Sequence, residues 1–145
     1  MSLEADIYKL LTTTHFGSSA PAFGTRAYPA VAPENVTYPC AIYDLSSAEF
    51  EKDLGGDGLI DTHYYTVVVM SRQMQEAEIE TELIKSNLHG FSGASFASGV
   101  GSVSSTTTLA NNIRGIFVSA GSSYHNTDTH VYMREVELEI HIKRT

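Results

Sequence analysis

The stretch from residue 59 to residue 90 constrains the fold more than any other part of this sequence. Residues 59–70 are rich in β-branched and aromatic side chains and contain no Gly or Pro, which predicts a long strand. After residue 73, apolar side chains recur at the spacings of one helical face: Ala77, Ile79, Leu83, Ile84, Leu88 and Phe91. Glutamates occupy much of the remaining helix surface, and Gly90 stands where a glycine commonly ends a helix. A strand leading directly into an amphipathic helix predicts a sheet with a helix packed on one face.

The two ends of the chain supply further parts of the predicted core. Near the N-terminus, one apolar helical stripe is formed by Leu3, Ile7, Leu10 and Leu11. Ser2 can cap this helix, and Glu4 and Asp6 lie close to its positive end. In the last strand, Val136, Leu138, Ile140 and Ile142 alternate with Glu135, Glu137, Glu139 and His141. We expect both helices to pack on the apolar face of this strand.

The middle of the chain completes the predicted architecture. Residues 38–45 resume a strand pattern, and the glycine-rich turn at residues 55–58 predicts a hairpin with the long strand. Residues 92–112 are dominated by Ser, Thr and Gly, which predicts a long mobile loop, and residues 113–118 predict a short strand. The expected fold is α+β: a mixed or mainly antiparallel sheet with two helices packed on it, as a single domain over residues 1–145.

The charge balance excludes several classes of partner. The chain has 17 Asp and Glu residues against 9 Lys and Arg, which gives a net charge of −8. A general nucleic-acid binder needs a basic surface, and no basic cluster is present that would hold an anionic membrane. No apolar run approaches the roughly 20 residues of a membrane-spanning helix. The one cysteine, Cys40, permits no internal disulfide and fits a reducing cytosol.

Two stretches contain residue types that bind metal ions. His125, Asp128 and His130 stand within six residues, but no fourth ligand or helical spacing accompanies them, so a polar turn is the favoured interpretation. Residues 53–58 begin like a calcium-binding loop. However, Gly55 occupies the third position and Tyr64 the twelfth, where oxygen ligands are required, so a hairpin turn is favoured. The sequence predicts no metal site.

The candidates for catalysis are equally weak. Cys40 follows a proline within a strand pattern, where a small buried side chain is expected, and no local motif supplies a histidine base. Glu135, Glu137 and Glu139 share a strand face at a spacing of about 7 Å, from a rise of ~3.3 Å per residue. Paired carboxylates can act as acid and base, but three in a row on a strand are more often a solvated face. We therefore predict a protein that is not an enzyme and uses no cofactor.

Four features, taken in chain order, carry a resemblance to a known family. They are residues 26–29 followed by Ala32 and Pro33; residues 38–43; the long strand with its acidic helix; and residues 124–129 followed by a strand to Lys143. In this order they resemble the tail terminator (tail completion) proteins of long-tailed bacteriophages and prophages. The resemblance covers most of the chain apart from residues 92–112, and this tract is longer than expected for the family.

The resemblance implies a structural role in virion assembly. Proteins of this family form a six-fold ring that caps the tail tube and faces the head connector, so the implied partners are further copies of the chain, the tail tube protein and a head-completion protein. DNA passes through the central hole without specific binding, and an acidic lumen would repel its backbone. The implied location is the neck of the virion, after assembly in the host cytoplasm.

Candidate residues for this role follow from their chemistry. For the contact between subunits we expect the hairpin at residues 38–70 to contribute through Tyr64 or Tyr65, whichever is exposed. Apolar side chains in the Ser/Thr/Gly tract are expected to order on contact with a partner: Phe96, Val100, Val103 and Leu109. The candidates for the channel surface are Glu135, Glu137 and Glu139.

Two alternatives remain open at the level of sequence. The first is a head-completion, or stopper, protein on the head side of the neck, which would share small size, ring assembly and acidity. The second is a small-molecule-binding or hydrolytic α+β domain that uses Cys40 or the group of His125, Asp128 and His130. Oligomeric state and a metal assay separate the second alternative from an assembly protein.

Overall fold

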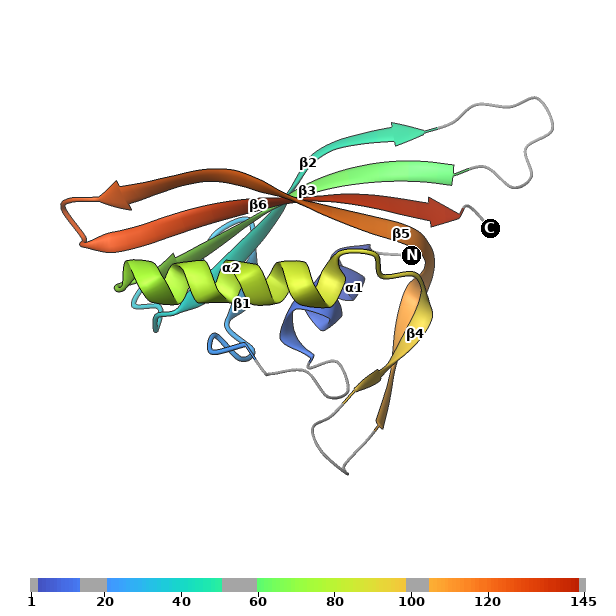
Figure 1. Ribbon diagram of the computed structural model, residues 1–145, viewed down its shortest axis with the longest axis horizontal. Helices are drawn as coiled ribbons and strands as arrows, with labels where there is room; N and C mark the ends of the chain where they lie inside the picture. Colours follow the sequence, from blue (N-terminus) through green and yellow to red (C-terminus); the bar gives the residue numbers. More distant parts are fainter. Residues whose placement is uncertain (1–2, 14–20, 51–59, 99–104, 144–145) are drawn as a thin grey trace.

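The computed structural model describes residues 3–13, 21–50, 60–98 and 105–143 (Figure 1). In chain order the elements are α1 (Leu3–Thr12), β1 (Ala27–Pro29), β2 (Cys40–Phe50), β3 (Ile60–Ser71), α2 (Met74–Leu88), β4 (Gly93–Ser98), β5 (Ser105–Asn126) and β6 (Val131–Lys143). The six strands form one sheet in the order β1-β2-β3-β6-β5-β4. The β1–β2 pair is parallel, and the other neighbouring strands are antiparallel.

The expectation of an α+β fold is wrong. Strands make up 56% of the described residues, and the sheet curls into a half-barrel accompanied by only two short helices. The difference arises mainly in β5, which runs for 22 residues. It contains the short strand predicted at residues 113–118, but it begins in residues 105–112, whose Ser, Thr and Gly content indicated a loop. β5 pairs with β4 at its beginning and with β6 along the rest of its length. The Gly and Asn residues of β5 have low strand propensity, and pairing with neighbouring strands outweighs their individual preference; the β-branched threonines at residues 106–108 favour a strand themselves.

The predicted hairpin and helix are confirmed. β2 and β3 pair from Cys40 opposite Met70 to Phe50 opposite Asp61, while the glycine-rich turn predicted at residues 55–58 lies outside the described residues. At the junction of β3 and α2, the buried Ser71 hydroxyl donates to Glu76 Oε1 (2.6 Å) and accepts from the Gln73 N–H (3.1 Å). These local bonds turn the chain from strand to helix within three residues.

The core lies between the sheet and the two helices. The four predicted residues of α1 and the four of β6 are all buried in one cluster, as are Ile84 and Leu88 of α2. Leu83 is only half-buried and Ile79 is 51% exposed, whereas Glu80 and Thr81 are buried. The face of α2 that packs on the sheet is therefore rotated about the helix axis relative to the apolar face predicted from the sequence.

An acidic side chain braces α1 against β5. Asp6 is fully buried; its Oδ1 accepts from the Ala110 N–H (2.7 Å), and its Oδ2 accepts from the Asn111 N–H (2.9 Å) and Asn111 Nδ2 (2.8 Å). On the same helix, Lys9 Nζ donates to the Thr108 carbonyl (2.9 Å). Asp6 therefore holds β5 near the point where it passes from β4 to β6, a role that its position near a helix start did not reveal.

Candidate interaction surfaces

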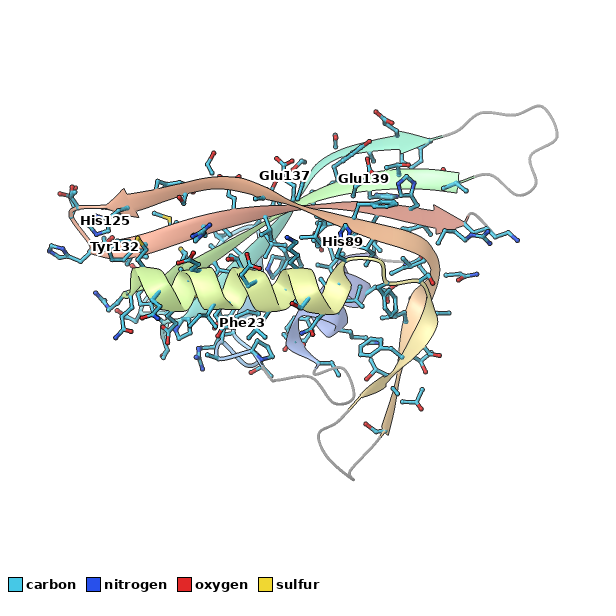
Figure 2. The ribbon with its side chains drawn as sticks, viewed as in Figure 1. Phe23, His89, His125, Tyr132, Glu137 and Glu139 are labelled. Carbon is cyan, nitrogen blue, oxygen red and sulfur yellow. The ribbon has the colours of Figure 1, made fainter. Side chains whose placement is uncertain are left out.

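The sheet face opposite the helices is acidic. Strand alternation places Glu135, Glu137 and Glu139 on this face of β6, directly opposite Val68, Thr66 and Tyr64 of β3. Across β3, Asp44 and Glu49 of β2 lie opposite Thr66 and Thr62. Figure 2 shows the labelled Glu137 and Glu139 on the side of the sheet away from α2. We refer to the five carboxylates as the acidic face: Asp44, Glu49, Glu135, Glu137 and Glu139.

Hydrogen bonds and ring contacts fix the side chains at one end of this face. His141 Nε2 lies 3.2 Å from Glu139 Oε2, and His141 Nδ1 lies 3.2 Å from Thr62 Oγ1. The Phe117 ring, 53% exposed, meets the His141 ring edge to face at 5.6 Å between centroids. The pKa of Tyr64 is raised by desolvation, by a hydrogen bond with Glu139, and by the charges of Glu49 and Glu139.

The Thr62–His141–Glu139 row has the residue types of a nucleophile, a base and an orienting acid. Catalysis would also need donors that stabilise an oxyanion. Both strands that carry these residues lie inside the sheet, with a neighbour on each side, so their backbone N–H groups are engaged in the ladder. The arrangement therefore positions polar side chains on a surface and offers no pair of free backbone donors among the described residues of these strands.

Several predicted interface residues belong to the core instead. Tyr65 is 4% exposed, Leu109 is 5% exposed and Phe96 is 9% exposed, and all three lie in the hydrophobic cluster of the subunit. The expectation that Phe96 and Leu109 serve as anchors for a partner is wrong, because the paired strands β4 and β5 carry them into the subunit's own core. Val100 and Val103 lie outside the described residues. Tyr64 is half-buried and remains a candidate.

The candidates for metal binding and nucleophilic catalysis lie in surroundings that do not favour either chemistry. At the tip of the β5–β6 hairpin, the His125 ring stacks on the Tyr132 ring with 4.2 Å between centroids (Figure 2). The centroid of the His130 ring lies 6.3 Å from that of His125. Within the described parts of the chain, no group of three or more His, Cys, Asp or Glu residues is placed to hold a metal ion. Cys40 is fully buried, and burial raises the pKa of its thiol to about 11, which disfavours the nucleophilic thiolate.

Two other parts of the surface are apolar, and sequence reasoning did not single them out. On α2, Met74 is 60% exposed and Ile79 is 51% exposed; at the free end of β2, Leu45 is 45% exposed and Phe50 is 60% exposed. Two hollows lie between α2 and the β5–β6 ribbon. The first, about 220 Å³, includes Lys85, Ala120 and Arg134 in its lining, and the second, about 190 Å³, includes Met74, Tyr124 and Tyr132.

Comparison with known proteins identifies a shared fold. No family model matches this sequence, and no curated protein matches it. Among solved structures, a chain from the virion of a native gene transfer agent (GTA) particle superposes with a TM-score of 0.56. The match covers 83% of this chain and 81% of that chain at 11% identity, so it establishes a common fold. No helix in the described ranges is both long and apolar enough to span a membrane.

Proposed function

We propose that this protein is a structural component of a phage-like virion, and that it forms a ring which caps the tail tube and joins it to the head connector. The observation that carries the proposal is the fold shared with a chain of the GTA virion over four-fifths of both chains. The resemblance of several segments to tail terminator proteins supports the finer role. Neither the shared fold nor the resemblance of these segments depends on a catalytic group.

The acidic face gives this role a physical basis. Its five carboxylates lie on β2 and β6, the two strands that flank β3, so their negative potential adds up over one continuous surface. Facing the path of DNA, such a surface repels phosphates and prevents the adhesion that a basic channel would cause. We assign Glu135, Glu137 and Glu139 to the lumen of the ring.

The decisive experiment is electron microscopy of the purified protein mixed separately with tail tubes and with heads from its own particle. We expect rings bound to the ends of tubes. Density on heads alone would assign the protein to head completion, and absence from both would refute a role at the neck.

Charge reversal tests the assignment to the lumen. Changing Glu135, Glu137 and Glu139 to Lys moves the net charge of the subunit from −8 to −2, because each substitution adds two units. We expect particles carrying this variant to assemble but to eject DNA more slowly. The control changes Glu4, Glu34 and Asp128, all exposed, to Lys, which gives the same net charge away from the acidic face. Equal ejection rates in the two variants would place this face outside the channel.

A further inference from the structure

Two segments of the sheet edge have no strand partner in the described parts of the chain. β1 covers β2 only at residues 41–43, so the edge of β2 from Asp44 to Phe50 is open. β4 covers β5 only as far as Ile113, and the His89–Gly90 segment bonds to β5 at Ile116 and Val118. Beyond these residues, the edge of β5 from Ser119 to Asn126 is open, and each of its residues is exposed. Open edges present unpaired backbone donors and acceptors that favour pairing with another chain.

The two open edges match in length, whereas the β2 edge carries two acidic residues, Asp44 and Glu49, and the β5 edge carries none. The β2 edge has seven residues and the β5 edge has eight, or about 23 and 26 Å at ~3.3 Å per residue. The β5 edge carries neither Pro nor any Lys, Arg, Asp or Glu in the sequence Ser-Ala-Gly-Ser-Ser-Tyr-His-Asn. These are the residues with which natural proteins block edge pairing, so this edge is chemically permissive.

Side chains on the two edges are also complementary. Leu45 and Phe50 lie opposite Tyr65 and Asp61 of β3, on the side of the sheet that carries the helices, yet both are exposed. On the same side of the β5 edge, the two hollows beside α2 are open. A strand added to β5 would bring its helix-side residues over these hollows. Leu45 and Phe50 of another copy have the apolar character to cover the second hollow, which Met74, Tyr124 and Tyr132 line. The first hollow is lined mainly by polar and charged side chains, among them Glu82, Lys85 and Arg134.

The directions of the strands define how two copies meet. β2, β3, β6 and β5 alternate in direction, so β2 of a second copy that continues the sheet in the same orientation runs antiparallel to β5. Figure 1 shows the open ends of β2 and β5 at opposite ends of the sheet. A second copy is therefore displaced along the strands as well as across them.

The size of this displacement is compatible with a closed ring. Through the cross-strand register, the middle of the open β2 edge is level with Glu139 and Ile140 of β6, and that of the β5 edge with Arg134. The next copy is therefore shifted by about 18 Å along the strand direction, from ~3.3 Å per residue. Its shift perpendicular to the strands is roughly 19 Å, which is four spacings between neighbouring strands. The resulting slant of about 40–45° is close to the 35–45° tilt of strands in closed barrels.

From these observations we infer that the β2 edge of one subunit pairs with the β5 edge of a second copy, which joins the subunits into a continuous antiparallel sheet. The two surfaces differ, so the contact is heterologous and repeats from copy to copy until it closes. The inference rests on the proposed function for the biological use of the ring, but the contact itself is a property of the isolated protein.

Proline substitutions at Ala120 and Ala48 each prevent backbone pairing at one edge, that of β5 or that of β2. Val118, opposite Leu138, directs its N–H away from β6 to His89 Nδ1 (3.0 Å), and Ala120, opposite Val136, follows in the same alternation. Tyr43, opposite Val67, accepts from the Ala30 N–H on the outer side of β2, and Ala48, opposite His63, has the same orientation. Ala120→Pro and Ala48→Pro therefore delete outward N–H groups that the subunit does not use in its own ladder.

Sedimentation of the variants, alone and mixed, measures the pairing. We expect wild type to form closed oligomers, and each variant alone to be monomeric. An equimolar mixture should form a one-to-one dimer, because Ala48→Pro retains the β5 edge and Ala120→Pro retains the β2 edge. Oligomers of wild-type size from either single variant, or a mixture that stays monomeric, would overturn the pairing. A wild-type protein that stays monomeric at every concentration would do so as well.

Three further variants separate the possible causes of a change in oligomeric state. Ala120→Lys and Ala48→Lys keep the backbone N–H and place a charge at each edge, so they repeat the test if a proline variant fails to fold. Tyr64→Ser tests the alternative contact that the sequence predicts at this residue: loss of oligomers in this variant alone would return the contact to the acidic face. Binding to tail tubes is scored separately, so failure of the proposed function leaves the sedimentation result interpretable.

Discussion

Replacing Asp6 with Asn tests whether this residue acts as a buried brace or as a helix-start charge. In the structure both carboxylate oxygens accept hydrogen bonds from β5, two at Oδ2 and one at Oδ1. Asn keeps the size of the side chain but places an NH₂ group at one of these positions. A donor would then face at least one donor of Ala110 or Asn111, whichever way the amide is turned.

The expected loss follows from the number and kind of bonds. Hydrogen bonds to charged groups contribute about 1.5–3 kcal/mol each, and a buried donor left without a partner costs about 1–3 kcal/mol. Ala110 is exposed, so water can replace its partner, whereas the Asn111 groups are half-buried. We therefore expect Asp6→Asn to lower the free energy of unfolding by about 3–5 kcal/mol, well below the sum of three separate bonds.

Urea denaturation followed by circular dichroism measures this loss, with Glu4→Gln as the matched control. Glu4 lies in the same first turn but is exposed, so its substitution removes only the favourable interaction with the helix dipole, about 0.3–1 kcal/mol. If Asp6→Asn costs no more than Glu4→Gln, the bonds to β5 contribute nothing and the brace is refuted. Asp6→Ala should be at least as destabilising as Asp6→Asn, since Ala keeps neither acceptor and Asn keeps one.

Two further predictions concern the core. Leu138→Ala, at a side chain only 1% exposed, should cost about 2–5 kcal/mol in urea denaturation, while the adjacent Glu137→Ala should cost less than about 0.5 kcal/mol; similar losses would contradict the assignment of the two β6 faces. Burial raises the pKa of Glu80, with the charge of Glu76 adding to the effect, so the folded protein holds this proton more tightly than the unfolded chain does. This contribution to stability is present below the unfolded pKa of about 4.3 and is lost as pH rises through the folded pKa. Glu80→Gln should therefore gain stability relative to wild type as pH rises above the unfolded pKa, and a difference that does not change with pH would rule out titration of Glu80.

The acidic face combines one row of glutamates that the sequence predicts with carboxylates that only the fold brings to the same face. Alternation in β6 identified Glu135, Glu137 and Glu139 as one face because side chains of a strand point to opposite sides in turn. That pattern contains no information about neighbouring strands. Asp44 and Glu49 join the same face only because β2 lies next to β3, and β3 next to β6. The extended negative surface is therefore a property of the register between strands.

The sequence by itself determined the elements whose local signals agree. The strand over residues 60–71, the helix after it and the alternating last strand were predicted within a few residues, because periodic apolar side chains report which face is buried. The same periodicity identified four buried apolar residues in α1 and four in β6. In these segments propensity and burial favour the same structure.

Only the tertiary structure decided the length of β5, the fold class and the position of the open edges. Gly and Asn in residues 105–126 disfavour a strand and Ser gives no clear signal, and hydrogen bonds to β4 and β6 make these residues strand. The same pairing buries Phe96 and Leu109, which sequence reasoning assigned to a partner. The unpaired edges depend on where each neighbouring strand stops, since an edge is defined by contacts between segments far apart in the sequence.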